Sequence, residues 1–339
     1  NKNSEYRLMA TYKEEHGNAI LKVTTDPTNP VNGQVWYNST SQTLKGFTAN
    51  PAGSWSTANN SNTARSGLMG TGTQTAGLIY SGYNIPSAVN VANTEQYNGT
   101  SWTEVADVNN ARRLGGRGGT TTAAICSAGQ NPGSRSDFVE LWNGSAWTET
   151  TDTNTAKRRL GSNGTSTSNL IMGGETAPGA EITETEVWNG TSWTEVADLN
   201  NARSSLAASG ADSTASIIAG GYTGTAKSAA SEQWNGSAWT EVADLNTARW
   251  EVVGANGTYT STIVSGGTIP AKQTVTESWN GSTWTEVADL NTARSDHASG
   301  GSSTAAFING GEQPPGDSST AKTEEFNSPL ETTVTFTTS

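Results

Sequence analysis

A short tryptophan-led segment recurs along most of this chain and constrains its fold more than any other feature. The segment is Trp-Thr-Glu-Val-Ala-Asp-Leu-Asn-Thr-Ala-Arg, and the leading tryptophans of successive copies lie 45 to 47 residues apart. Two copies are identical, and the other four match progressively less well. The six copies occupy residues 239–249, 284–294, 193–203, 102–112, 147–157 and 55–65. A fixed period of this length is typical of solenoids, propellers and other arrays of one repeated unit.

Each unit divides into four segments with the character of β-strands. A run of small residues follows the closing cation, and an apolar run such as 170–172 then leads into a pair of glycines. A third segment ends in an aromatic residue such as Trp188, and the fourth begins at the repeated tryptophan, here Trp193. Asn189 and Gly190 stand between them, and Asn-Gly is a strong hairpin signal because both residues tolerate a positive φ. The pattern predicts an all-β propeller of four-stranded antiparallel blades.

The glycine pair, the third-strand aromatic, the second tryptophan and the closing arginine together resemble the kelch repeat. The resemblance covers about residues 54–329 and implies a kelch-like β-propeller. The first unit departs from the pattern, because Thr57 and Asn60 stand where the other units have Glu and Asp.

The rest of the chain is expected to flank this propeller. We expect an N-terminal docking or linker segment (1–33), a β-hairpin (34–53), the propeller of six units of about 46 residues (54–329) and a C-terminal strand (330–339). With six blades, the strand at Trp55 completes the last blade beside the strand that ends at Phe326. With seven, residues 332–336 close that blade and residues 18–57 build an extra one.

Composition excludes several function classes. The formal charge of −12 disfavours nucleic acid, and no apolar run approaches the roughly 18 residues of a membrane span. The single cysteine, Cys126, lies in an apolar run and is expected to be a small buried hydrophobe. The two histidines, His16 and His297, are far apart in sequence. We therefore expect no enzyme, no catalytic residues, no metal site and no cofactor.

Two oppositely charged residues recur in every unit and are expected to form a structural bond within or between blades. The glutamate precedes the third-strand aromatic by two positions, so both side chains point to the same face. The alternative, a carboxylate ring around a central channel that binds cations, is less economical. The repeated structural residues are Glu95, Glu140, Glu186, Glu232, Glu277 and Glu324, with Arg65, Arg112, Lys157, Arg203, Arg249 and Arg294, and the tryptophans Trp102, Trp147, Trp193, Trp239 and Trp284.

The units differ most after the glycine pair, in the loop between the second and third strands. In an up-and-down blade this loop emerges on the same face as the connection from the fourth strand to the next blade, and such variable loops build binding surfaces. Neutral drift of exposed loops is the alternative. Trp250 also breaks the pattern and is a candidate exposed tryptophan. The candidate binding-face residues are Tyr83, Asn84, Gln130, Asn131, Arg135, Glu175, Tyr222, Lys227, Trp250, Lys272, Glu312 and Gln313.

Residues 33–47, which include Trp36, Tyr37 and Asn38, resemble a segment near the start of tail-fibre and other virion proteins of tailed phages. Together with the units that end in Asn-Thr-Ala-Arg, they resemble kelch-like structural proteins of marine phages. The resemblance implies a non-enzymatic, surface-exposed virion protein (fibre, tail or capsid decoration), often a homo-oligomer. Its N-terminal segment would dock on another virion protein, and its propeller face would bind a host-surface glycan or protein. A free or cell-surface lectin is the alternative, and a polysaccharide-acting enzyme is a third possibility.

Overall fold

The computed structural model describes residues 20–28, 33–50, 52–252, 255–328 and 330–336, and these residues form strands and turns. The chain divides into two compact units. The larger unit is Ser54–Asn327, and the smaller unit combines residues from both ends of the chain, Asn1–Gly53 and Ser328–Ser339. The propeller-like part therefore lies between two segments that belong to one separate unit.

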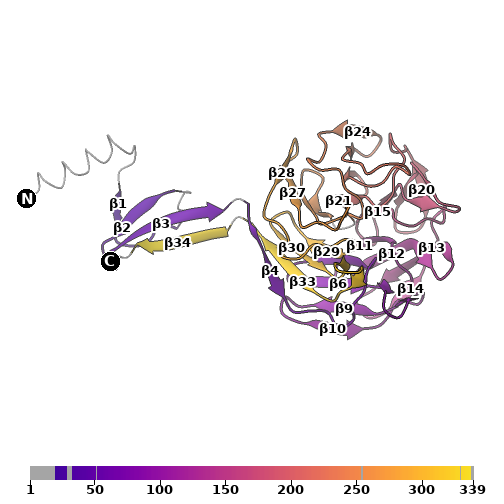
Figure 1. Ribbon diagram of the computed structural model, residues 1–339, viewed down its shortest axis with the longest axis horizontal. Helices are drawn as coiled ribbons and strands as arrows, with labels where there is room; N and C mark the ends of the chain where they lie inside the picture. Colours follow the sequence, from indigo (N-terminus) through magenta and orange to yellow (C-terminus); the bar gives the residue numbers. More distant parts are fainter. Residues whose placement is uncertain (1–19, 29–32, 51, 253–254, 329, 337–339) are drawn as a thin grey trace, which may run out of the picture. The chain divides into compact units, whose positions relative to one another are not determined.

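The larger unit contains six four-stranded antiparallel sheets, which we number I to VI (Figure 1). Sheet I is β5 (Met69–Thr73), β6 (Ala76–Tyr80), β9 (Thr94–Tyr97) and β10 (Trp102–Val105). Sheet II is β11 (Gly116–Gly119), β12 (Ala124–Asn131), β13 (Ser134–Trp142) and β14 (Trp147–Glu149). Sheet III is β15 (Gly161–Gly164), β16 (Asn169–Met172), β19 (Thr185–Trp188) and β20 (Trp193–Val196). The prediction of four-stranded antiparallel sheets is confirmed.

Sheets IV and V continue this order, and sheet VI takes its last strand from the beginning of the unit. Sheet IV is β21 (Ala207–Asp212), β22 (Ala215–Ala219), β23 (Ser231–Trp234) and β24 (Trp239–Val242). Sheet V is β25 (Ala255–Thr258), β26 (Ser261–Ser265), β27 (Thr276–Trp279) and β28 (Trp284–Glu286). Sheet VI is β29 (Ala298–Gly301), β30 (Ala305–Asn309), β33 (Thr323–Asn327) and β4 (Ser54–Ala58).

The pairing of β4 answers one question that the sequence left open. β4 pairs with β33 in antiparallel register, with Trp55 opposite Phe326, as the six-bladed arrangement predicts. The alternative in which residues 332–336 complete this sheet is wrong, because that strand pairs elsewhere. The first strands of the sheets lie side by side in the order β5, β11, β15, β21, β25 and β29, and β29 also lies beside β5.

The apolar second strands form the core of each sheet. Strands β16 and β22, for example, are buried along nearly their whole length, because sheets pack on both of their faces. The glycine pair follows, as at Gly173 (φ 59°) and Gly174 (φ 103°), where the chain leaves the strand in the left-handed region. A Cβ at Gly174 would lie 2.8 Å from the carbonyl oxygen of Arg158, so glycine is required there by space as well as by φ.

The predicted Asn-Gly hairpins are present, but their geometry differs from the expectation. Trp188 lies opposite Trp193, with four residues between them. Gly190 has a φ of 93°, whereas Asn189 is not among the residues with positive φ. The Asn189 side-chain oxygen instead accepts hydrogen bonds from the backbone N–H groups of Thr191 and Ser192, each at 2.9 Å. The asparagine therefore recurs because its side chain holds the turn.

The smaller unit is a four-stranded sheet of order β1-β2-β3-β34. Its strands are β1 (Leu21–Val23), β2 (Val35–Asn38), β3 (Thr43–Asn50) and β34 (Leu330–Phe336). The predicted hairpin is β2 and β3, and β1 pairs with β2 in parallel. β34 pairs with β3 along seven residues, so the C-terminal strand belongs to this sheet. Of the predicted docking segment, residues 1–19 and 29–32 lie outside the described residues.

The Asp26 carboxylate contacts three side chains of the smaller sheet. Asp26 accepts hydrogen bonds from the indole N–H of Trp36 at 3.0 Å and from the amide of Asn38 at 2.8 Å, and it forms an ion pair with Lys45. The bonds from Asn38, Lys45 and Trp36 lower the pKa of Asp26 to about 2. The Trp-Tyr-Asn sequence of β2 is therefore tied to the connector that precedes it.

Three short two-stranded hairpins extend the loops between second and third strands. They are β7 (Tyr83–Asn84) with β8 (Val89–Asn90), β17 (Glu175–Thr176) with β18 (Ala180–Glu181), and β31 (Glu312–Gln313) with β32 (Ser318–Ser319).

Candidate functional site

The six repeated glutamates each form a buried ion pair with a repeated cation. The cation lies in the connector that enters a sheet, and the glutamate lies on the third strand of that sheet. Four pairs have nitrogen–oxygen distances between 2.7 and 3.2 Å, and all twelve residues are at most 2% exposed. The pairs are Arg65–Glu95, Arg112–Glu140, Lys157–Glu186, Arg203–Glu232, Arg249–Glu277 and Arg294–Glu324. The predicted pairing is present in every sheet.

A repeated asparagine completes each pair, and the sequence interpretation missed it. Asn246, three residues before Arg249, donates from its backbone N–H at 2.7 Å and from its side-chain amide at 2.8 Å to Oε2 of Glu277. The arginine approaches the other oxygen, Oε1. The same arrangement recurs for Asn62, Asn109, Asn154, Asn200 and Asn291. An asparagine three positions before each cation was the signal in the sequence.

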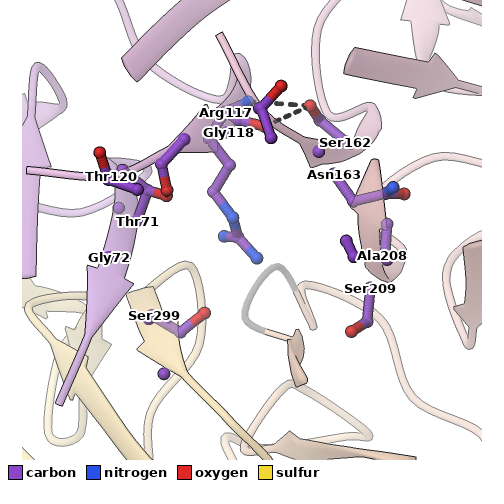
Figure 2. A pocket seen from close by; sticks show the side chains of 18 of the residues that line it. Thr71, Gly72, Arg117, Gly118, Thr120, Ser162, Asn163, Ala208, Ser209 and Ser299 are labelled. Carbon is purple, nitrogen blue, oxygen red and sulfur yellow. Dashed lines mark hydrogen bonds between the residues drawn. The ribbon is translucent and has the colours of Figure 1, made fainter. Parts of the chain in front are cut away.

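These glutamates do not line a channel. A central cavity of about 270 Å³ is bordered by the first strands of the sheets, and its lining includes none of the six glutamates. The lining is mostly Gly, Ser, Thr and Asn, and Arg117 projects into the open space, as Figure 2 shows. Ser162 holds the Arg117 backbone, accepting from its N–H at 3.0 Å and donating to its oxygen at 2.7 Å. Burial lowers the pKa of Arg117 to about 10. The geometry does not support the channel-carboxylate alternative.

The second tryptophan of each unit packs between neighbouring sheets. Trp239 of sheet IV donates its indole N–H to the Thr185 hydroxyl of sheet III at 3.1 Å, and it lies against Trp234 of its own sheet at 5.5 Å. It is 6% exposed. The other repeated tryptophans, Trp102, Trp147, Trp193 and Trp284, are equally buried. Their burial agrees with the expected role in the core.

Immediately after each cation, a variable residue forms a bridge to the loop that follows the second strand. In every sheet, this bridge brings two variable positions together. They lie on the face where the loop between the second and third strands and the connector from the previous sheet both emerge. We call these twelve residues the variable ring: Ser66 with Tyr83, Arg113 with Gln130, Arg158 with Glu175, Ser204 with Tyr222, Trp250 with Thr268, and Ser295 with Glu312. The predicted convergence of variable loops and fourth-to-first connections on one face is observed.

Inside the variable ring, the next residue of each connector has a positive φ and hydrogen-bonds to its neighbour. The backbone N–H of Leu114 donates to the oxygen of Gly67, and that of Arg159 donates to Leu114. The bond from Gly67 to Asp296 joins sheet I to sheet VI. The six residues with this conformation are Gly67, Leu114, Arg159, Ser205, Glu251 and Asp296.

The predicted binding-face residues occupy this face in different ways. Tyr83, Gln130, Glu175, Tyr222, Trp250 and Glu312 belong to the variable ring. Four further residues lie beside it. Asn84 donates a hydrogen bond to the backbone oxygen of Ala64, and Lys227 forms a backbone bridge with Tyr222. Arg135 forms an ion pair with Glu175, and Lys272 forms ion pairs with Glu312 and Asp317. Asn131 lies at the end of β12. Gln313 follows Glu312 in β31 and is buried, as Gln130 is, at 7% and 8% exposed.

Trp250 is half-buried rather than exposed. The centre of its ring lies 5.2 Å from the centre of the Tyr222 ring. The Arg159 guanidinium lies over the Trp250 ring, 5.5 Å from the ring centre. The sequence interpretation passed over the neighbouring arginines Arg113, Arg158 and Arg159, although each follows the cation position of its unit directly.

A groove of about 360 Å³ lies on this face between the loops of sheets I and II. We call it the Tyr83–Arg113 groove. The Arg113 guanidinium lies over the Tyr83 ring, with its central carbon 3.8 Å from the ring centre. The groove is lined by Tyr83, Ala88, Val89, Asn90, Arg113, Gln130, Asn131, Pro132 and Gly133.

Reactive groups are buried or isolated in the described part of the chain. Cys126 is fully buried, as expected, and burial raises the pKa of its thiol to about 11. Burial lowers the pKa of His297 to about 3, with Arg294 and Arg117 acting in the same direction, and His16 lies outside the described residues. Burial also raises the pKa of Asp296 well above its usual range. No three His, Cys, Asp or Glu side chains of the described ranges gather in a way that could hold a metal ion.

None of the described segments forms a helix with the length and apolar character that a membrane crossing requires. Comparison with known proteins adds no assignment: the chain matches no protein-family model and no curated protein.

Proposed function

We propose that the larger unit is a closed six-bladed propeller of kelch-like blades. Two observations at opposite ends of this unit support closure. β4 from its beginning completes the sheet of β33 at its end, and β29 lies beside β5. The backbone bond from Gly67 to Asp296 crosses the same junction near the axis.

We further propose that the chain is a non-enzymatic binding protein of a phage virion. The observation that carries this proposal is the separation of two kinds of residue. The same buried glutamate, asparagine and cation recur in all six sheets, whereas the variable ring gathers different side chains on one face. A constant scaffold that displays a variable face is suited to recognition, with host-surface glycans or proteins as ligands. The repeated glutamate forms a buried ion pair in all six sheets rather than standing out in one, which supports a structural role for it over acid–base catalysis.

The smaller unit is the proposed attachment module. It collects residues from both ends of the chain into one sheet, so the propeller is anchored through two connections rather than one. In a virion, this unit and the segment that precedes it would dock on another structural protein, and copies of the chain would assemble together on the particle. A free or cell-surface lectin would use the same face without such an attachment.

The direct test is antibody-gold labelling of intact particles from the source material, with an antibody raised against the full chain. Mass spectrometry of the same density fraction gives an independent readout. Gold at a defined position, such as the tail tip or a capsid vertex, is the expected result. Recovery of the protein only from soluble or cell-envelope fractions would reject the virion assignment and favour the lectin.

A further inference from the structure

The Tyr83–Arg113 groove has the size and construction of a small-molecule site. Its volume of about 360 Å³ falls in the range of roughly 300–1,000 Å³ that ligand pockets span. It lies where the loop of sheet I faces the loop and connector of sheet II. Two different loops therefore form its two walls.

The walls are held together by hydrogen bonds within the groove. The Asn90 amide from one loop donates to the oxygen of Gln130 on the other at 2.8 Å. Gln130 in turn donates to the oxygen of Asn131 at 2.8 Å and accepts from Arg158 at 2.9 Å. Pro132 restrains this turn because proline fixes its own φ, and Gly133 supplies the positive φ of 93° that the turn adopts. A ligand would therefore lose little binding energy to ordering these loops.

The chemistry of the lining favours an anionic ligand. The Arg113 guanidinium is the only charged group among the lining residues, all of which the structure describes. It forms no ion pair with a described residue, and its contact with the Tyr83 ring, 3.8 Å from the ring centre, restricts its movement. A guanidinium with a fixed orientation matches the two oxygens of a carboxylate. Val89, which is 49% exposed, adds an apolar surface beside amide groups.

The corresponding positions of the other sheets do not repeat this combination. Arg158 already faces Glu175, with 2.9 Å between nitrogen and oxygen. Trp250 packs against Tyr222 with the two rings tilted at 42°, and the remaining connectors carry serine at this position. Within the described variable ring, a cation that no carboxylate neutralises lies over an aromatic ring only between sheets I and II.

We propose that the Tyr83–Arg113 groove binds an acidic sugar residue of a surface glycan, with the sugar carboxylate on Arg113 and the apolar side of its ring against Val89. The amides of Asn90 and Asn131 are the groups that meet its hydroxyls. This inference rests on the proposed glycan-binding function of the face, and it names the class of sugar.

The test is a calorimetric titration of the full chain with uronic-acid oligosaccharides and a sialylated oligosaccharide. Each acidic probe is compared with its carboxyl-reduced form, which keeps the sugar ring and removes the charge. Binding of an acidic probe is expected to weaken about 10- to 100-fold on carboxyl reduction or in Arg113→Ser, because a charged hydrogen-bonded pair is lost. Serine stands at the equivalent position in three other sheets.

Two exposed substitutions keep the test independent of folding. Both Val89→Glu and Val89→Lys remove the apolar contact from every probe, but their charge acts on the acidic probes alone. Val89→Glu should therefore weaken acidic probes more than reduced ones, and Val89→Lys should weaken acidic probes less than reduced ones. Lys322→Ser is the matched control, because it removes one positive charge from an exposed side chain that precedes the third strand of sheet VI. It should change affinity less than about twofold, because Lys322 does not line the groove.

The outcomes separate this inference from the proposed function. Acidic and reduced probes that bind equally well, with no effect of Arg113→Ser, would overturn the acidic-sugar assignment and leave glycan binding intact. A failure of every acidic probe, with binding of neutral glycans, would do the same. The absence of binding to any glycan would overturn both the acidic-sugar assignment and glycan binding by this face, and the proposed function would then require a protein ligand.

Discussion

Arg112 and Arg113 are consecutive residues of the same type with opposite roles. Arg112 is fully buried and forms an ion pair with Glu140 at 2.7 Å, whereas Arg113 is half-buried and lines the groove over Tyr83. Adjacent side chains of an extended connector point in opposite directions, so one enters the space between sheets and the next reaches the surface. In every unit the first position keeps a cation and the second varies. The position of an arginine within the repeat, rather than its residue type, therefore determines whether it belongs to the buried ion pairs or to the surface.

The largest expected effect comes from removing a scaffold carboxylate. Glu186→Ala leaves Lys157 buried without its partner at 2.9 Å, and this should lower the free energy of unfolding by about 3–5 kcal/mol. Glu195→Ala is the matched control, because Glu195 lies directly opposite Glu186 on the neighbouring strand and is exposed. Urea unfolding of both variants measures the difference. Equal midpoints for the two would mean that the buried pairs do not hold the sheets together.

An intermediate effect is expected at His297, a scaffold position with an unusual residue. Leucine stands at the equivalent position in sheets I, III and IV (Leu68, Leu160 and Leu206), all buried. The pKa of His297 is about 3 when folded, against about 6.5 when unfolded. As the pH falls from 6.5 towards 3, the unfolded chain gains a proton that the folded chain does not. Stability is therefore lost in this window, by about 1.4 kcal/mol per pH unit.

His297→Leu should remove this contribution, so its stability should fall less steeply than that of the wild type below pH 6.5. Above pH 7 the two proteins should show similar slopes, because the histidine is neutral in both states. Urea unfolding at pH 7.5 and pH 5.5 compares them. If the wild type and His297→Leu lost the same free energy of unfolding between these two pH values, His297 would have to take up a proton in the folded protein.

The repeat pattern predicted the sheets well because the same local sequence features recur in every unit. The apolar run, the glycine pair and the Asn-Gly turn each fix one element, and Trp55 opposite Phe326 follows from aligning the first unit with the last. The partner of β34 was harder to predict, since seven alternating residues can add to any open sheet edge. Its actual partner, β3, lies 280 or more residues earlier, and no local signal marks that pairing.

The candidate site was predicted only in part for a related reason. The variable loops were identified because their sequences differ between units. The connector residues that face these loops come directly after a strongly repeated motif, so they were interpreted as part of that motif. Arg113 was overlooked because Arg112 beside it carries the repeat. The asparagine of the buried cluster was overlooked for the opposite reason: it recurs in each unit, but Asn is common in turns.

The smallest expected effect concerns the boundary between scaffold and variable ring. Trp250→Ser places at this position the residue that sheets I, IV and VI carry there. The indole packs against the Tyr222 ring, 5.2 Å between ring centres, and is half-buried, so its loss should cost about 0.5–1.5 kcal/mol. Trp239→Ser is the contrasting variant, because its ring is 6% exposed, packs between sheets III and IV and donates to Thr185. It should cost several-fold more.

Chemical unfolding of both tryptophan variants decides whether the two positions differ as their surroundings imply. A cost at Trp250 as large as that at Trp239 would place Trp250 in the scaffold, and its departure from the repeat would then reflect packing. A small cost would leave position 250 free to vary, as it does among the six units. Such freedom is what a surface needs when its side chains are selected for a ligand rather than for the fold.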